Sequence, residues 1–345
     1  MTMFHQGKKP FKVLGFGEVM LRLSPVGKER ISQSETFEKK SGGSELNVVA
    51  GISQLGLRTG IITKLPDNEI GKFIKNKIRY SGISDDYIVY DQKDDKRLGV
   101  YYYESGAYPR VPTVVYDRGN SSFTHFRAQE LPENVYTETD IFHVSGITLA
   151  LSEQIRKEAI EMMQRFKKAG ACISFDVNYR ATLWDEDTAR ETISEILPYI
   201  DILFISEETL RRMFRQTGTL EEIHRNFAEL HPNLKVILST MRQATSPTRH
   251  TFTSLVYDCT KKEFFSEEPY RDIEVVDRIG SGDAYVAGAL FGLLKYGGID
   301  EAVRFGNAMA ALKNTIPGDM TACDFNDIKR VIDAHVSGQS SEMVR

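Results

Sequence analysis

Cysteine is scarce in this chain of 345 residues, and no long apolar run is present. The three cysteines, Cys172, Cys259 and Cys323, lie far apart without C-x-x-C spacing, which argues against a disulfide framework and favours buried thiols in a reducing compartment. The longest nearly apolar stretch, Tyr285–Leu294, is far shorter than the roughly 20 residues of a membrane span. Residues 1–10 lack the apolar core of a signal peptide, and we expect them to form a flexible tail. A cytoplasmic protein that does not bind membranes is therefore expected.

Excess charge and metal-binding patterns are also missing. Lysine and arginine number 44 against 48 aspartates and glutamates, a formal net charge of -4, and without a basic stripe this balance argues against a nucleic-acid partner. The seven histidines include no H-x-x-x-H pair, so a zinc enzyme is not indicated. Neither a Walker-type phosphate loop nor the H-R-D and D-F-G motifs of protein kinases occur.

Short β-branched runs alternate with longer amphipathic segments along the chain. Near-continuous apolar strands followed by helices are what a parallel sheet covered on both faces requires. We therefore predict one α/β domain over residues 11–335, with a doubly wound, mainly parallel sheet, and a frayed end over residues 336–345. The predicted strands lie at 12–17, 60–64, 140–144, 171–176, 201–205 and 235–238.

Two regions, at about 18–40 and 87–126, break this alternation. The second is rich in tyrosine, valine, glycine and proline and has no helical period, which is typical of hairpin strands outside the main sheet. A small β appendage beside the core predicts a cleft between the two, which a movable lid would close to exclude water. Plain solvent-facing strands are the alternative. An exposed strand edge needs a partner or a cover, which is compatible with a homodimer joined through the lid strands.

The segment 275–291 carries the strongest chemical pattern. Gly280, Ser281 and Gly282 stand where a predicted strand gives way to an apolar helix, and uncovered N–H groups at a helix start attract anions. Asp283 follows them directly. A carboxylate beside an anion site is placed as a general base must be, within reach of a hydroxyl that attacks a phosphorus held there. Asp283 could equally be a helix cap.

A second pattern lies upstream, in the segment 41–50. Gly42 and Gly43 would let a ligand lie against bare backbone, and Asn47 offers both a donor and an acceptor. A glycine loop before a helix start is the alternative.

Both segments resemble motifs of the ribokinase-like (PfkB) carbohydrate kinases. Asp277-x-x-Gly280-Ser281-Gly282-Asp283 is similar to the C-terminal Asp-x-x-Gly-Ala-Gly-Asp signature, with Ser281 in place of alanine, and Gly42-Gly43-x-x-x-Asn47 is similar to the N-terminal Gly-Gly-x-x-x-Asn element. The resemblance extends from about Phe11 to Asp324. It implies a ribokinase-like fold, ATP and Mg²⁺ as cofactors and a monovalent cation as a third candidate. It further implies that Asp283 takes a proton from the sugar, that the amides of 280–283 hold the phosphoryl group, and that the sugar contacts Gly42, Gly43 and Asn47.

Four further segments, at 17–25, 99–101, 116–118 and 175–184, resemble the 2-keto-3-deoxygluconate kinase branch of that family. The implied reaction is phosphorylation of the terminal 6-hydroxyl of this acidic sugar. A forked guanidinium suits a carboxylate, which a neutral hexose lacks, and this favours the acidic sugar. A fructokinase or another neutral-sugar kinase of the same family is the alternative. Arg118 could instead be solvated, Arg180 could clamp ATP, and Asp319 could close a turn. The residues assigned to the substrate by this resemblance are Tyr101, Tyr116, Arg118, Arg180 and Asp319.

On the nucleotide side, the resemblance implies ATP contacts from Asn178, Arg180, Ser239, Thr240 and Asn307. The chain departs from the family at Ser206-Glu207-Glu208-Thr209, where Asn-x-x-Glu is usual, so the metal ligands stay unassigned. Another departure is the segment 239–244, where Thr-x-Gly is usual. Arg242 there could replace backbone contacts to phosphate or face solvent.

Two other classes of protein fit the sequence less well. Gly15-Phe16-Gly17 suggests a dinucleotide-binding oxidoreductase only weakly, since no third glycine stands at Met20 and no helix start follows. A silent sugar sensor on the same scaffold would be expected to lack a base, whereas Asp283 is present.

Overall fold

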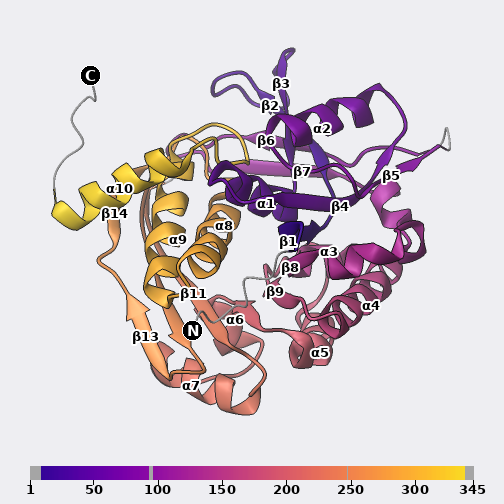
Figure 1. Ribbon diagram of the computed structural model, residues 1–345. Helices are drawn as coiled ribbons and strands as arrows, with labels where there is room; N and C mark the ends of the chain where they lie inside the picture. The colour runs from indigo at the N-terminus through magenta and orange to yellow at the C-terminus, as the bar shows by residue number, and fades with distance from the viewer. Residues whose placement is uncertain (1–8, 93–95, 247, 339–345) are drawn as a thin grey trace.

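The structure, a computed structural model, describes residues 9–92, 96–246 and 248–338 (Figure 1). Most of the predicted flexible tail and of the predicted frayed end lies outside these residues. Within them, the Lys9 ammonium donates to the Thr139 carbonyl at 2.9 Å. The last helix, α10 (Phe325–Ser337), runs past residue 335 and ends at Gly338, which adopts a left-handed conformation with φ 65°. Fraying from residue 336 is thus corrected for 336–338.

A ten-stranded sheet forms the centre of the described chain, in the order β13-β12-β11-β10-β9-β8-β1-β4-β5, with β14 paired to β12. All neighbours from β5 to β11 are parallel, and β12 to β14 add an antiparallel edge. All six predicted strands occur in it, which confirms the mainly parallel sheet. The strands are β1 (Phe11–Phe16), β4 (Thr59–Pro66), β5 (Ile88–Asp91), β8 (Thr139–Ser145), β9 (Cys172–Asp176), β10 (Ile202–Phe204), β11 (Val236–Ser246), β12 (Arg249–Asp258), β13 (Glu263–Ser266) and β14 (Tyr270–Glu274).

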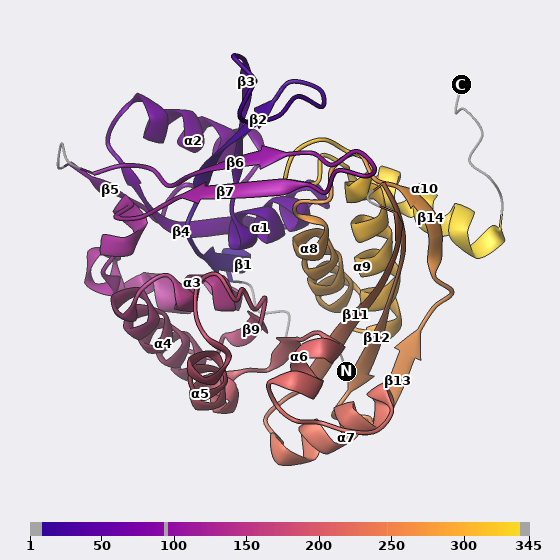
Figure 2. The ribbon, with the colours of Figure 1, turned by 180° about the vertical axis from the view of Figure 1, so that it is seen from behind.

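Helices cover both faces of this sheet (Figures 1 and 2). Successive residues of β1 point to opposite faces, so Val13 joins one apolar cluster, with α1, α8 and α9, and Leu14 joins the other, with α4, α5 and α7. The sheet is therefore doubly wound, as predicted. Besides α10 and several short 3-10 turns, the helices are α1 (Ser44–Gln54), α2 (Glu69–Tyr80), α3 (Gly146–Ala150), α4 (Glu153–Lys168), α5 (Glu186–Ile196), α6 (Glu207–Arg212), α7 (Leu220–Leu230), α8 (Ser281–Lys295) and α9 (Ile299–Asn314).

A second, four-stranded sheet lies beside the core and is visible at the top of Figure 2. It consists of β2 (Met20–Pro25), β3 (Phe37–Gly42), β6 (Val100–Glu104) and β7 (Thr113–Asp117), in the order β3-β2-β6-β7. The predicted small β appendage is confirmed, but the region 87–126 contributes less to it than expected. Its first strand, β5, pairs with β4 of the central sheet, because Tyr87 and Ile88 are buried against the core.

A buried ion pair network joins the small sheet to two loops of the core, those that precede α8 and follow α9. Arg22 of β2 is 3% exposed and donates at 2.6 Å both to Asp277 and to Asp319 of the core. Separately, none of the helices in the described ranges has the length and apolar character needed to cross a bilayer.

Candidate active site

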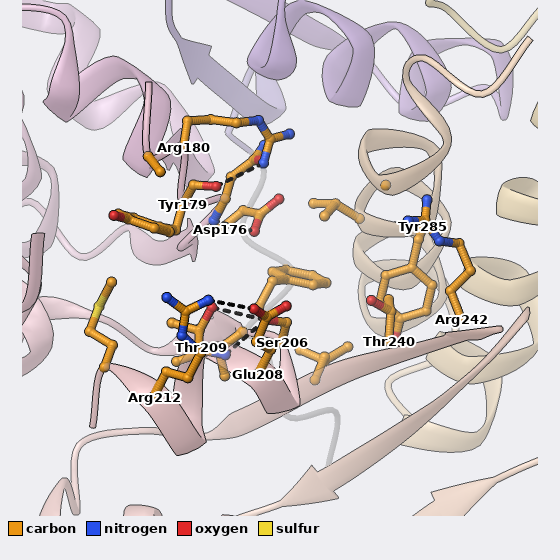
Figure 3. A pocket seen from close by; sticks show the side chains of 18 of the residues that line it. Asp176, Tyr179, Arg180, Ser206, Glu208, Thr209, Arg212, Thr240, Arg242 and Tyr285 are labelled. Atoms are coloured by element: carbon orange, nitrogen blue, oxygen red, sulfur yellow. Dashed lines mark hydrogen bonds and ion pairs between the residues drawn. The ribbon is translucent and has the colours of Figure 1, made fainter. Parts of the chain in front are cut away.

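Two adjoining cavities open where the carboxyl ends of β9, β10 and β11 face the start of α8, the edge at which parallel sheets bind ligands. The cradle cavity, about 470 Å³, lies between the small sheet and the first turns of α1 and α8. The outer cavity, about 570 Å³, lies between the strand ends, α6 and α8 (Figure 3). Both are lined by Asp176, Asn178, Arg180, Arg242 and Gly282.

Gly280 shapes the start of α8. Its φ of 81° is left-handed, and a Cβ at this position would lie 1.9 Å from the Asp319 carbonyl oxygen, so glycine is required. Among the described residues, the amides of Gly280, Gly282 and Asp283 have no acceptor, whereas the Ser281 amide donates to the Arg278 carbonyl at 3.3 Å. Three amides of the predicted anion site are thus free to bind an anion. The Ser281 amide is not available, because it forms a hydrogen bond within the turn.

Asp283 faces the cradle cavity, and each of its two carboxylate oxygens is bonded to a side chain of α1. Its carboxylate accepts hydrogen bonds from the Ser44 hydroxyl at 2.9 Å and from the Asn47 amide at 2.7 Å. Burial is the main cause that raises its pKa to about 6, against the hydrogen bonds from Asn47 and Ser44, which lower it. The side chain therefore does not cap the helix, and it faces the cavity and not the protein interior.

The two glycines of the upstream motif differ in their roles. Gly43 lines the cradle cavity, and Asn47 does too, with an amide oxygen that is buried and has no partner among the described residues. Gly42 does not line it. A Cβ there would lie 2.2 Å from the Asp319 carboxylate, so Gly42 permits close packing within the protein, which corrects its assignment to the sugar.

Two expected substrate contacts are occupied by protein partners. Both Nε and Nη2 of Arg118 donate to one oxygen of Glu18, the first at 2.8 Å. The Asp319 carboxylate is taken by Arg22 and by the Tyr101 hydroxyl. The prediction that Arg118 offers a free fork to a carboxylate is therefore corrected. A substrate contact from Asp319 stays a prediction, since Tyr101, Tyr116, Arg118 and Asp319 all line the cradle cavity.

Three guanidinium groups face the cavities without an acidic partner among the described residues. Arg180 donates to the Tyr179 carbonyl at 3.0 Å, and no residue in the described ranges accepts a hydrogen bond from the side chain of Arg242 or Arg278. Burial and the charge of Arg278 lower the pKa of Arg242. Like charges held together without an anion indicate a site for one. Arg242 is exposed and also lines both cavities, so a phosphate contact from it stays a prediction. Arg278, which lines the cradle cavity, stands at a variable position of the motif and carried no signal of its own.

Some of the residues predicted to contact ATP line a cavity, and others are buried in the core. Thr240 lines the outer cavity, whereas the next residue back, Ser239, points to the opposite face, is wholly buried and donates to the Ile205 carbonyl at 2.6 Å. Asn307 is also wholly buried, lines neither cavity and donates to Glu267 at 2.9 Å. The structure therefore corrects two predicted ATP contacts, Ser239 and Asn307, and keeps Thr240, Asn178 and Arg180 at the cavities.

The segment 206–209 forms the start of α6 (Figure 3). Ser206 caps the helix by accepting from the Thr209 amide at 3.1 Å, and Glu207 and Glu208 pair with arginines one turn on. Within the described ranges, no three histidine, cysteine or acidic side chains gather to hold a metal. The carboxylate that faces both cavities is Asp176, whose pKa burial raises to about 7, with a further rise from the charge of Asp283.

The sequence matches the family model described as pfkB family carbohydrate kinase over residues 11–324. The chain belongs to this family. The 2-dehydro-3-deoxygalactonokinase of Haloferax volcanii is 33% identical over 321 residues, 93% of this chain and 96% of that protein. The 2-dehydro-3-deoxygluconokinase of Bacillus subtilis is 30% identical over 308 residues, 88% of this chain and 90% of that protein. A solved 2-dehydro-3-deoxygluconokinase from Thermotoga maritima superposes with a TM-score of 0.88 at 30% identity, covering 94% and 99% of the two chains.

These similarities confirm the ribokinase-like fold and the resemblance to kinases of 2-keto-3-deoxy sugar acids. The protein is a sugar kinase, an enzyme that transfers a phosphoryl group to an alcohol. The weaker oxidoreductase hypothesis fails on the fold as well, because β1 is followed by the strand β2 and not by the helix that a dinucleotide site needs.

Proposed function

We propose that this kinase phosphorylates the terminal 6-hydroxyl of 2-keto-3-deoxygluconate, with Asp283 as the general base. The observation that carries the proposal is the Asp283 carboxylate, fixed by Ser44 and Asn47 beside the unpaired amides of Gly282 and Asp283 at the start of α8. Acceptor hydroxyl, base and phosphate site would then meet in one cavity.

In the reaction, the sugar oxygen attacks the γ-phosphorus of ATP while its proton passes to Asp283. The bond from that phosphorus to the bridging oxygen breaks, and ADP leaves. The amides of Gly282 and Asp283 would donate to the oxygens on which negative charge spreads, and Arg242 and Arg278, which have no acidic partner among the described residues, line the same cavity. The unpartnered amide oxygen of Asn47 can accept a second sugar hydroxyl.

The outer cavity is the proposed nucleotide side, with Thr240, Asn178 and Arg180 on its wall. The residues present fit Mg²⁺ bound to ATP, because this ion uses one or two carboxylates with phosphates and waters. Asp176 is the carboxylate we assign to it, since it faces both cavities. Among the described residues its carboxylate accepts one hydrogen bond, from the backbone N–H of Asn178 at 3.1 Å. The ion would supply positive charge to the phosphate oxygens.

An acidic acceptor is supported by the names of the relatives and by cationic groups at the cradle cavity. Arg118 keeps its Nη1 without an acceptor among the described residues, although Glu18 takes its other two donors. The pairing of Arg118 with Glu18 also favours a neutral sugar such as fructose, because Glu18 partly neutralises the guanidinium that was expected to bind the substrate carboxylate.

Truncating Arg118 tests this choice. In Arg118→Ala, kcat/KM for 2-keto-3-deoxygluconate should fall about 10- to 100-fold, the loss of one charge-assisted hydrogen bond, with little change for fructose. ADP release is measured across 2-keto-3-deoxygluconate, its C4 epimer 2-keto-3-deoxygalactonate and fructose. Comparable wild-type kcat/KM for fructose and the acids would reject the acidic substrate, and the two epimers decide the C4 configuration.

We also propose a homodimer joined through the small sheet. Val115 and Tyr116 of the edge strand β7 are 47% and 51% exposed, and Val111 before it is 67% exposed, an apolar strand edge that needs a cover. Light scattering should give twice the chain mass of 39.1 kDa, and Val115→Glu should give the monomer. A monomeric wild type at micromolar concentration would contradict the dimer.

A further inference from the structure

Lys313 is a wholly buried cation that the proposed reaction does not use. It stands in the last turn of α9, and its side chain is 0% exposed. The ammonium donates to two backbone carbonyl oxygens, those of Asp277 and Ile316, each at 3.1 Å. In the described part of the chain, no carboxylate forms a salt bridge with it. Burying a charge costs free energy unless hydrogen bonds compensate for it. Two backbone carbonyls compensate for the buried ammonium here in place of a carboxylate, and this arrangement calls for an explanation.

Both carbonyls belong to segments that define the anion site. Asp277 begins the turn that leads into Gly280, and Ile316 precedes the loop whose Asp319 carbonyl lies against Gly280. The side chain of Asp277 links the same segments, since it accepts the Gly318 amide at 2.9 Å and the Ile279 amide at 3.1 Å. Lys313 therefore links the segment that leads from Asp277 into Gly280 to the loop that leads from Ile316 to Asp319.

Charge is balanced in this interior. The carboxylates of Asp277 and Asp319 face the two buried cations Arg22 and Lys313, but Arg22 takes the direct hydrogen bonds to both of them, at 2.6 Å. The charges of Asp277 and Asp319 stabilise the protonated form of Lys313, while burial, the larger effect, lowers its pKa. The ammonium is thus left to backbone oxygens, the same type of ligand that binds K⁺ in a dehydrated site.

We propose that Lys313 is a positioning residue whose ammonium acts as a resident cation behind the anion site, so that no separate K⁺ or NH₄⁺ ion is needed there. Its hydrogen bonds to Asp277 and Ile316 fix the turn that presents the amides of Gly280, Gly282 and Asp283. The effect on turnover rests on the proposed function, but the cation binding expected after truncation does not.

A helix C-terminus favours a cation, so Lys313 could serve stability alone. The variant Lys313→Ala separates the two roles, because it leaves two carbonyl oxygens facing a space that a monovalent ion can fill. The matched variant Lys313→Met fills that space with an apolar chain. Each is compared in NH₄⁺, K⁺, Li⁺ and choline chloride at equal ionic strength, by melting temperature without ligands and by ADP release with the sugar acid.

We expect Lys313→Ala to lose about 10- to 100-fold in kcat in choline, as for a misplaced reacting group. NH₄⁺ or K⁺ should restore most of it and raise the melting temperature by a few degrees. Wild type and Lys313→Met should not respond to these ions, and Lys313→Met should stay folded with low kcat.

Full kcat of Lys313→Ala or Lys313→Met in choline would overturn the proposal, as would an Ala variant that no ion stabilises. If Lys313→Ala folds only with NH₄⁺ or K⁺, the proposal is supported. The two failures are distinguishable: a wild type inactive on every sugar acid, beside an NH₄⁺-stabilised Lys313→Ala, would reject the proposed substrate and keep the resident cation.

Discussion

Asp283→Asn lowers kcat by about 10²- to 10⁴-fold, the usual contribution of general base catalysis. The asparagine keeps the shape of the side chain and can still bond to Ser44 or Asn47, but it cannot take the proton from the attacking hydroxyl. Because the cradle amides and the outer cavity are unchanged, ATP binding should stay within a few-fold of wild type. Single-turnover ADP formation measures the first quantity, and calorimetric titration with Mg·ATP measures the second.

The pH dependence of kcat provides the control for this variant. The Asp283 pKa of about 6 means that acidification below this value protonates the base, so wild-type kcat should fall on the acid side. Ser44→Ala removes a hydrogen bond that favours the charged form, and it should move the acid limb to higher pH. Turnover of Asp283→Asn near the wild-type rate, with an unchanged acid limb, would show that another group takes the proton.

Gly282→Ala is the second large effect that we expect. A Cβ at Gly282 would meet no atom within 4 Å, and the residue lines both cavities. The methyl group would therefore stand in the space meant for the transferring phosphoryl group, and kcat should fall about 10²-fold, as when an oxyanion contact is lost. Because alanine favours a helix over glycine by about 1 kcal/mol, the free energy of unfolding should rise or stay the same.

The matched control is Gly119→Ala. A Cβ there would also meet nothing within 4 Å, but Gly119 is exposed and lines neither cavity. Melting temperature and kcat should both stay at wild-type values for this control. A Gly282→Ala enzyme with full kcat would mean that the phosphoryl group is held elsewhere.

The core of the fold could be predicted from the sequence because it depends on local patterns. Apolar β-branched runs such as the one around Val13 and Leu14 place side chains on both faces of a sheet, and this alone favours parallel strands between helices. The strands β12 to β14 carry mixed patterns and were not predicted, and β5 was assigned to the wrong sheet, since its four residues signal a strand but not its neighbour.

The site residues also divide into those set by local sequence, which could be predicted, and those set by distant partners, which could not. Asp283, Asn47 and Gly280 lie in motifs whose spacing fixes their geometry, and the structure brings them to one cavity. The partner of Arg118 could not be predicted, because Glu18 lies 100 residues away in the sequence. Ser239 and Thr240 were both predicted to contact ATP, but adjacent residues of a strand face opposite sides, so only Thr240 lines the cavity and Ser239 is buried in the core.

Identification of the phosphorylated product tests the proposed reaction most directly. Wild type is incubated with Mg·ATP and 2-keto-3-deoxygluconate, and the product is followed by ³¹P and ¹³C NMR. We expect one phosphate monoester on C6 for each ADP formed, and none with Asp283→Asn over the same period. ADP without a sugar phosphate, or phosphate on another carbon, would contradict a terminal hydroxyl held against Asp283.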